Sequence, residues 1–292
     1  MLELMKIVRI MGGLGNQMFQ YAFGRAIGHE TLFDLSWFDD LNVRSQSTPR
    51  SCELQKFNLK LSVASKNEID ILLTNNRLTK FLKYIRKLFH CPYYKIKQIQ
   101  EPDLCFHKDL MHISGNVYYT GYFQSEKYFW HIREQLLQDF SLQVQMNKEN
   151  IELLKQILSC NAVSLHVRRG DYVNLQHIYY VNDLKYYNNA ISYLVSKEKN
   201  IHFFLFSDDM DWVKKNLIIP YPTTYVDVND SNMAVFDMEL MKHCKHNIIA
   251  NSTFSWWGAW LNENPNKIVI APQYWYSNGM KTDIIPAKWI KI

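Results

Sequence analysis

The stretch KIVRIMGGLGNQ, residues 6–17, decides the fold of the N-terminal half. Its apolar segment over 6–11 predicts a short buried strand, and the glycines that follow predict a tight turn. The small and apolar face of residues 18–28 predicts a helix, and a second strand is expected over 31–35. Strand, turn, helix and strand in this order are typical of an α/β fold with a parallel sheet.

A second series of the same kind begins near residue 162. We expect strands over 162–167, 201–206, 224–228, 247–250 and 267–271, and helices over 183–197, 211–217, 234–244 and from 255 onward. Between the two series we expect helices over 67–89, 125–140 and 147–158, and a strand over 117–121. A length of 292 residues fits two domains. We therefore expect two facing Rossmann-type domains with parallel sheets, an N-terminal one over 1–158 and a C-terminal one over 159–292.

The net charge of +5 comes from one segment. Residues 71–100 contain seven Lys and Arg and no acidic residue, whereas the rest of the chain has slightly more acids than bases. A nucleic-acid-binding protein spreads its positive charge over a binding face, so we expect no nucleic-acid partner. The five cysteines form no paired motif and indicate a reducing compartment. With no secretory signal and no long apolar run, the sequence favours a cytoplasmic protein.

The basic segment, residues 77–97, carries apolar residues at helical spacing with cations beside them. One interpretation is a solvated helix that packs on the core. The other is an interfacial helix that contacts an anionic membrane, on its inner face, near a lipid-linked glycan.

Three polar clusters follow predicted strands, at 168–171, 207–209 and 251–255. In open parallel sheets, ligands bind beyond the carboxyl ends of the strands. Arg168 and Arg169 at the end of a buried strand favour an anion, because guanidinium forks match phosphate oxygens. The alternatives are an internal Arg–Asp pair or an exposed RGD adhesion tripeptide.

The other two clusters also have two interpretations each. Asp208 and Asp209 can accept hydrogen bonds from a base or ribose. The D-x-D at 209–211 suggests a metal site, but acidic residues are also favoured at the start of a helix. The helix start is the better interpretation, and we expect no metal site. Ser252, Thr253 and Ser255 lie at a predicted helix start, where hydroxyls and backbone N–H groups form an anion site. The alternative is a helix cap above core tryptophans.

The glycine turn is not a standard dinucleotide fingerprint, because Met18 stands where that motif has its third glycine. The backbone at Gly13 and Gly15 can still approach a ligand closely, with Asn16 at the helix start. The alternative is a structural turn with Asn16 as the cap. Motifs of serine hydrolases, P-loop proteins and zinc proteases are missing from the sequence.

Four motifs together resemble a known family. GGLGNQ (12–17), HVRRGD (166–171), FSDD (206–209) and NSTFSWWGAWL (251–261) are similar, in the same order, to those of bacterial α-1,2-fucosyltransferases, within a wider group of GDP-fucose-dependent enzymes. The resemblance implies a GT-B fold, a GDP-L-fucose donor, inversion, no required metal or cofactor, and a galactose-terminated oligosaccharide acceptor fucosylated at its 2-hydroxyl.

The resemblance also implies roles for individual residues. His166 and Arg168 match positions that contact the nucleotide and its diphosphate, and Arg169 and Asp171 complete that motif. Either Asp208 or Asp209 matches a guanosine contact. The run from Ser252 through Thr253 and Phe254 to Ser255 matches the base and phosphate loop, and Asn16 matches an asparagine that faces the donor from the other domain.

The chemistry of the transfer agrees with these roles. Negative charge grows on the departing diphosphate, and a chain without a metal cluster needs arginines and a helix N-terminus to stabilise it. Asp171 is our candidate for the base that accepts the acceptor's proton, with Asp34 and His166 as alternatives. Two other functions remain open, a fucosyltransferase of another linkage such as α-1,6 and a non-catalytic glycan- or nucleotide-binding protein.

Overall fold

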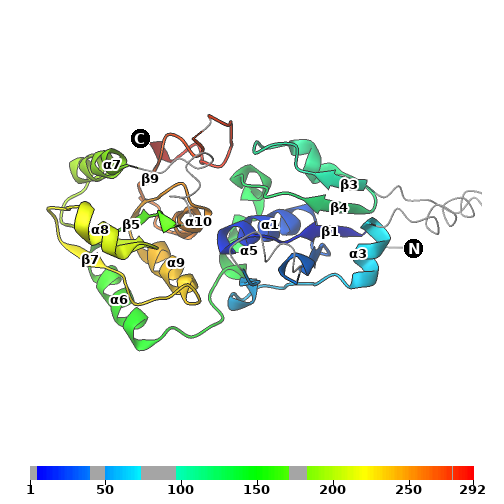
Figure 1. Ribbon diagram of the computed structural model, residues 1–292, viewed down its shortest axis with the longest axis horizontal. Helices are drawn as coiled ribbons and strands as arrows, with labels where there is room; N and C mark the ends of the chain where they lie inside the picture. The colour runs from blue at the N-terminus through cyan, green and yellow to red at the C-terminus, as the bar shows by residue number, and fades with distance from the viewer. Residues whose placement is uncertain (1–4, 40–49, 74–96, 171–182, 278) are drawn as a thin grey trace, which may run out of the picture. The chain divides into compact units, whose positions relative to one another are not determined.

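The computed structural model describes residues 5–39, 50–73, 97–170, 183–277 and 279–292 (Figure 1). The chain divides into two compact units, an N-terminal unit of Met1–Ser141 and a C-terminal unit of Leu142–Ile292. This division precedes the expected one at 158/159, because helix α6 (Lys148–Ser159) contacts α9 and β5 of the C-terminal unit.

The N-terminal unit contains a parallel sheet with the strand order β2-β1-β4-β3. The strands are β1 (Lys6–Arg9), β2 (Leu32–Asp34), β3 (Lys97–Gln100) and β4 (Val117–Thr120), and the main helices are α1 (Leu14–Ile27) and α3 (Lys66–Leu73). Helix α1 begins four residues before the expected helix at 18–28. Strand β3 was not predicted, because its sequence KQIQ has one apolar residue and lies half-exposed at the sheet edge.

The two faces of this sheet follow the alternation of side chains along a strand. Tyr119 of β4 packs edge-on against Phe23 of α1, with ring centroids 5.3 Å apart. The next residue back, Tyr118, points to the other face, where it packs with Ile7 and with Leu72 of α3. Helix α1 therefore covers one face of the sheet and α3 covers part of the other.

The continuous helix expected over 125–140 is not present. The segment forms two 3-10 turns, η4 (Glu126–Tyr128) and η5 (Trp130–Ile132), and the short helix α5 (Arg133–Asp139). Tyr128 and Phe129 are adjacent and both fully buried. Both rings reach the core through these tighter 3-10 turns and not through one continuous helix.

The C-terminal unit contains a six-stranded parallel sheet with the order β10-β9-β8-β5-β6-β7. Its strands are β5 (Asn161–Val167), β6 (Ile201–Ser207), β7 (Thr223–Tyr225), β8 (His246–Ile248), β9 (Val269–Ala271) and β10 (Ile290–Lys291). Its helices after α6 are α7 (Leu184–Lys197), α8 (Met210–Asn216), α9 (Ala234–His243) and α10 (Thr253–Leu261). The elements agree with the expected order, apart from the short final strand β10, which was not predicted.

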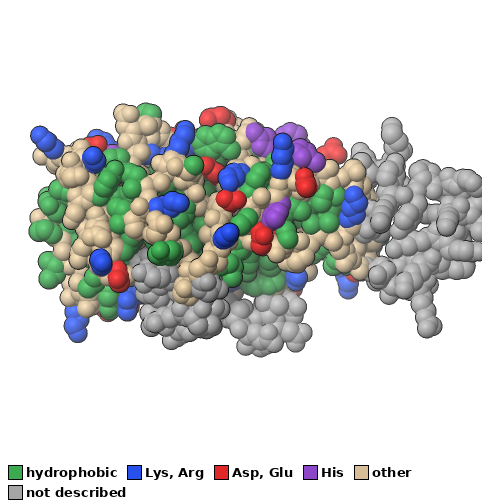
Figure 2. All heavy atoms as spheres, turned by 90° about the horizontal axis from the view of Figure 1, so that it is seen from above, with side chains coloured by type: hydrophobic (Ala, Val, Ile, Leu, Met, Phe, Trp, Pro, Cys, Tyr) green, Lys and Arg blue, Asp and Glu red, His purple; other side chains and the backbone are tan. Residues whose placement is uncertain are grey.

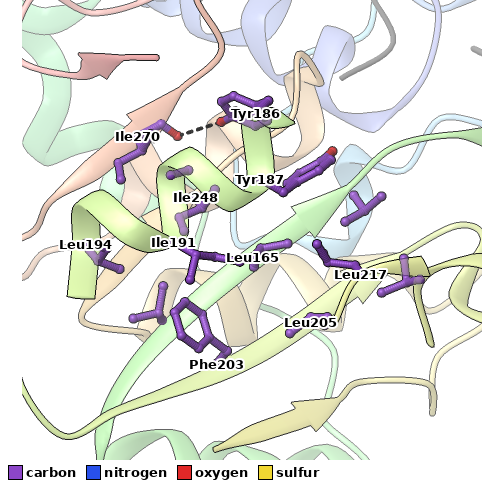
Figure 3. Close-up of a cluster of buried hydrophobic side chains, with 14 of the residues drawn as sticks. Leu165, Tyr186, Tyr187, Ile191, Leu194, Phe203, Leu205, Leu217, Ile248 and Ile270 are labelled. Carbon is purple, nitrogen blue, oxygen red and sulfur yellow. Dashed lines mark hydrogen bonds between the residues drawn. The ribbon is translucent and has the colours of Figure 1, made fainter. Parts of the chain in front are cut away.

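Both faces of this sheet are covered by helices. On one face, Leu165, Phe203 and Leu205 pack with α7 and α8 (Figure 3). On the other, Phe204 and Phe206 pack with α6 and α9. Burial on both faces explains the near-continuous apolar sequence of β6 and leaves polar residues only where the strands end.

The described residues show how positive charge is distributed and whether a helix could span a membrane. On the face shown in Figure 2, Lys and Arg side chains are spread singly among hydrophobic and acidic ones. None of the described helices combines the length and apolar character needed to span a bilayer. Most of the basic segment 77–97 lies outside the described residues, and its last residue, Lys97, begins β3.

Candidate active site

The carboxyl ends of β5 and β6 bring two of the predicted clusters together. The strands pair in parallel with Val167 opposite Ser207, so Arg168 and Asp208 follow at the same edge. Arg168 Nη1 lies 3.0 Å from Asp208 Oδ2, and both side chains are about three-quarters buried. This ion pair orients the guanidinium at the edge where ligands of parallel sheets bind.

Arg169 is held differently from its neighbour. Its guanidinium lies over the Trp212 ring, 3.7 Å from the ring centroid. Its Nε lies 3.4 Å from Asp209 Oδ2, and Asp209 also caps α8 by accepting a hydrogen bond from the Trp212 N–H at 3.2 Å. The side chain of Arg169 is thus fixed against α8, whereas its backbone N–H donates to Asp208 Oδ1 at 2.9 Å.

Gly170, the residue after these arginines, lies in close contact with Asp208. A Cβ added at Gly170 would lie 2.4 Å from Asp208 Oδ2, so only glycine fits without displacing the carboxylate. Asp171, our candidate for the base, lies outside the described residues, and its role stays a prediction.

His166 lies on β5, 5% exposed, with its ring centroid 5.8 Å from that of Phe254. Burial, helped by the charge of Arg168, lowers the pKa of His166 to about 3. The imidazole is therefore neutral at physiological pH, and a pKa this low makes it too weak a base for its alternative role. Its buried Nδ1 has no hydrogen-bond partner among the described residues, and a bound ligand could supply one.

The third cluster begins helix α10. Ser252 is the N-cap residue, but its side chain makes no capping hydrogen bond, and Ser255 Oγ donates to the Ser252 carbonyl at 3.3 Å. Thr253 and Phe254 are half-buried, whereas Trp256 is fully buried and donates from its indole N–H to Ile284 O at 2.7 Å. The tryptophan belongs to the core, while the first turn of the helix retains N–H groups that can bind an anion.

The glycine turn of the N-terminal unit differs from a simple cap. Gly13, not Asn16, is the N-cap of α1, and an added Cβ at Gly13 would meet no described atom within 4 Å. Gly12 adopts a φ of +79°, and its own Cβ would lie 2.9 Å from the Asn16 amide nitrogen. Gly15 lies buried in the first turn of α1. The turn therefore leaves open space above its backbone at Gly13, as a ligand contact requires.

Asn16 has a partner that the sequence did not reveal. Its Oδ1 accepts a hydrogen bond from Gln124 Nε2 at 2.9 Å. Gln124 follows β4 at the same edge of the sheet, after Phe123, which has the unusual φ of +51°. The polar sequence directly after an apolar strand was the signal that could have identified Gln124.

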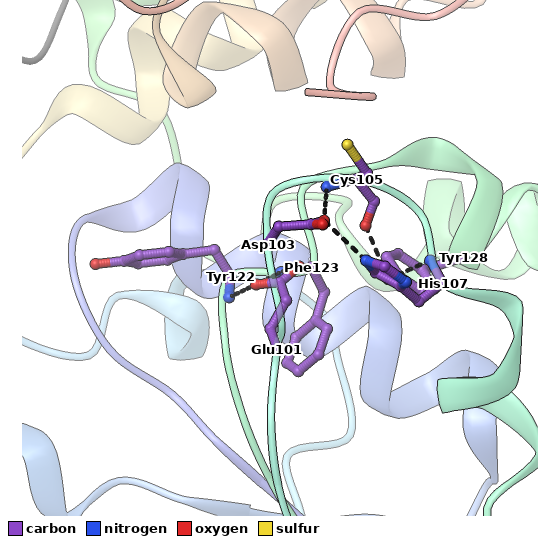
Figure 4. A network of polar contacts seen from close by, with 7 residues as sticks. All are labelled: Glu101, Asp103, Cys105, His107, Tyr122, Phe123 and Tyr128. Atoms are coloured by element: carbon purple, nitrogen blue, oxygen red, sulfur yellow. Dashed lines mark hydrogen bonds and ion pairs between the residues drawn. The ribbon is translucent and has the colours of Figure 1, made fainter. Parts of the chain in front are cut away.

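A half-buried carboxylate holds this loop in place (Figure 4). Glu101 accepts hydrogen bonds from the N–H groups of Tyr122 at 2.6 Å and Phe123 at 3.0 Å. A Cβ at Gly121 would lie 2.4 Å from Glu101 Cβ, so the two segments are in close contact. Burial raises the pKa of Glu101 above its usual range. Glu101 thereby positions Gln124, and through it Asn16.

Asp34, the other alternative for the base, is buried and already engaged. Its carboxylate accepts hydrogen bonds from the Tyr118 hydroxyl and from the Ser36 N–H, the latter at 2.8 Å. Among the described residues, no group of three or more His, Cys, Asp or Glu side chains is placed to hold a metal ion. Asp209, the first residue of the D-x-D, caps α8 as a helix start requires.

Comparison with known proteins assigns the family. The family model for glycosyl transferase family 11 matches residues 2–292. The chain belongs to glycosyltransferase family 11. This family 11 chain is 35% identical over 294 residues to the α-1,2-colitosyltransferase of Escherichia coli, with 98% of each chain covered. It is 33% identical over 305 residues to the O-antigen biosynthesis glycosyltransferase WbnK of Escherichia coli, covering 97% of this chain and 99% of that one.

A more distant relative and a solved structure are also similar to the chain. The family 11 chain is 28% identical over 160 residues to the galactoside 2-α-L-fucosyltransferase SEC1 of Bos taurus, which covers 51% of this chain and 44% of that protein. Its fold is similar to that of the α-1,6-fucosyltransferase NodZ soaked with GDP-fucose, with a TM-score of 0.50, 15% identity, and 89% and 92% of the two chains covered. The expected family and the GT-B fold with two parallel sheets are confirmed.

Proposed function

We propose that this family 11 glycosyltransferase transfers L-fucose from GDP-L-fucose to the 2-hydroxyl of a terminal galactose, with inversion and without a metal ion. The observation that carries the proposal is the adjacent placement of Arg168 and Asp208 beside His166 and the first turn of α10. The names of two relatives, an α-1,2-colitosyltransferase and a galactoside 2-α-L-fucosyltransferase, support the linkage.

In this proposal the C-terminal unit binds the donor. Arg168 contacts the diphosphate, since its planar guanidinium matches phosphate oxygens and Asp208 engages one of its terminal nitrogens, Nη1. The N–H groups at the start of α10 face the same negative charge, which the positive end of the helix dipole stabilises. The neutral His166 completes the site by a hydrogen bond from its buried imidazole to the nucleotide.

In the proposed transfer, the enzyme stabilises the negative charge that develops on the leaving diphosphate. The bond between fucose C1 and the diphosphate breaks as the galactose O2 bonds to C1 from the opposite face. Negative charge grows on the outer phosphate, where Arg168 and the α10 N–H groups lower the barrier. The hydroxyl proton passes to a base, for which Asp171 remains our candidate. The N-terminal unit, with the Asn16–Gln124 pair at its strand ends, serves the acceptor side.

A second candidate donor is favoured by the 35% identical relative, which is named for the transfer of colitose. A panel of GDP-fucose and GDP-colitose, each with a galactoside acceptor in EDTA, tests both by the rate of GDP release. We expect faster release with GDP-fucose. Faster release with GDP-colitose would replace the proposed donor, and tight GDP binding without release from either donor would favour the non-catalytic interpretation.

We also propose that the basic segment docks the enzyme on the cytoplasmic face of an anionic membrane, where a lipid-linked acceptor would lie. Its sequence holds Lys80, Lys83, Arg86 and Lys87 between apolar residues at helical spacing. Replacing these four cations by Gln should abolish co-sedimentation with anionic vesicles at low salt. Unchanged co-sedimentation would contradict this docking.

A further inference from the structure

The N-terminal unit contains a polar cavity that the proposed donor site does not use. It has a volume of about 400 Å³ and lies on the face of the sheet that α3 covers in part. All four strands contribute to its lining. The lining residues are Arg9 from β1, Asp34 from β2, Gln98, Ile99 and Gln100 from β3, Tyr118 and Thr120 from β4, and Ser36 and Leu73 from the segments beside them.

The strand register explains why polar groups gather here. Arg9 pairs with Asp34 in the β1–β2 ladder, and Gln100 pairs with Thr120 in the β3–β4 ladder. These four residues end their strands. The described part of α3 ends at Leu73, and Gln98 Nε2 donates to the Leu73 carbonyl at 3.2 Å, which closes one wall.

The charges in the cavity are balanced. Arg9 supplies one positive charge and Asp34 one negative charge, and the other polar groups are amides and hydroxyls. Asp34 is satisfied by the Tyr118 hydroxyl and the Ser36 N–H. In contrast, the buried Nε of Arg9 has no hydrogen-bond partner among the described residues. A ligand with hydroxyl acceptors would satisfy this donor, and a lining with one positive and one negative charge gives no net attraction to an anion or a cation.

We propose that this cavity binds a neutral sugar residue of the acceptor glycan, a proposal that rests on the proposed transferase function. Amide, guanidinium and hydroxyl groups can hydrogen-bond sugar hydroxyls, and the volume is typical of small-molecule sites. The cavity also adjoins the glycine turn along the chain. Strand β1 leads through Gly12 to Asn16, and β4 leads through Gly121 to Gln124, which bonds Asn16.

The kinetic test uses Gln100→Ala and Arg9→Met, with Gln156→Ala on the exposed surface of α6 as a matched control. Each cavity variant should raise the KM for a galactoside acceptor about 3- to 10-fold, the effect of one lost hydrogen bond. The KM for GDP-fucose and the slow hydrolysis of the donor without acceptor should not change. An unchanged acceptor KM, or an equal rise in the donor KM, would overturn the proposal.

A binding measurement keeps the test independent of catalysis. Ligand-observed NMR with lactose should show binding to the wild-type chain and to Gln156→Ala, and weaker binding to both cavity variants. Equal lactose binding by all four proteins, or tighter binding of galacturonic acid than of galactose, would overturn the assignment. A wild-type chain that binds lactose but transfers no sugar would contradict the transferase function and leave the cavity supported.

Discussion

The two adjacent arginines should fail in different ways when each is replaced by alanine. Arg168 pairs with Asp208 at the carboxyl ends of β5 and β6, whereas Arg169 is stacked on Trp212. Loss of a group that stabilises developing charge costs about 10² to 10³ in rate, or about 3 to 4 kcal/mol. We therefore expect kcat/KM of Arg168→Ala to fall by that factor. Arg168→Lys keeps the charge but loses the fork, and should fall by about tenfold.

Arg169→Ala should instead destabilise the C-terminal unit. The stacking contributes about 0.5 to 2 kcal/mol and the partly exposed ion pair at most about 1 kcal/mol. In a unit of about 150 residues this lowers Tm by roughly 2 to 10 °C. GDP-release kinetics and scanning fluorimetry measure both effects on the same preparations. If Arg168→Ala keeps full activity, or Arg169→Ala loses activity as Arg168→Ala does at unchanged Tm, the division of roles is refuted.

Three further changes test other parts of the structure. Burial raises the pKa of Asp237 to about 7, so this group's contribution to stability falls as pH rises from about 4 to 7. In urea unfolding, the free energy of unfolding of Asp237→Asn relative to wild type should therefore rise by about 3 kcal/mol between pH 5 and pH 8. A difference that stays constant with pH would contradict this. Gly170→Ala should displace Asp208 and lower kcat/KM at least tenfold with the fold retained by circular dichroism, whereas wild-type kinetics would show that the contact is tolerated. Glu101→Ala should speed amide hydrogen exchange at Tyr122 and Phe123, because both backbone N–H groups lose their acceptor; unchanged exchange would argue against Glu101 as the anchor.

Local sequence patterns were sufficient for the order of most elements of the C-terminal unit and for the position of Arg168 and Asp208 at the ends of its strands. The apolar segments that form β5 and β6 are continuous because the sheet is buried on both faces, so Arg168 and Asp208 could be identified as strand-end residues. The separate roles of the two arginines could not be predicted. They depend on Trp212, which is distant in sequence and approaches Arg169 only when α8 forms.

The N-terminal unit was less predictable for the same physical reason. Strand β1 pairs with β4 across more than 100 residues, and only this pairing brings Gln124 to Asn16. The cavity likewise depends on strands whose order no local pattern specifies. Strand β3 has too few apolar residues to indicate a strand. The apolar spacing over 125–140 does not show that this segment divides into two 3-10 turns and a short helix.

The most direct test is the linkage of the product made in EDTA. Wild-type enzyme is incubated with GDP-fucose and a β-galactoside, and NMR of the product gives the position and the anomeric configuration of the new bond. The proposed function predicts fucose attached in α configuration to O2 of the galactose, formed at a rate that added Mg²⁺ or Mn²⁺ does not raise. Fucose at another position, a β configuration, or product only after a divalent ion is restored would contradict it.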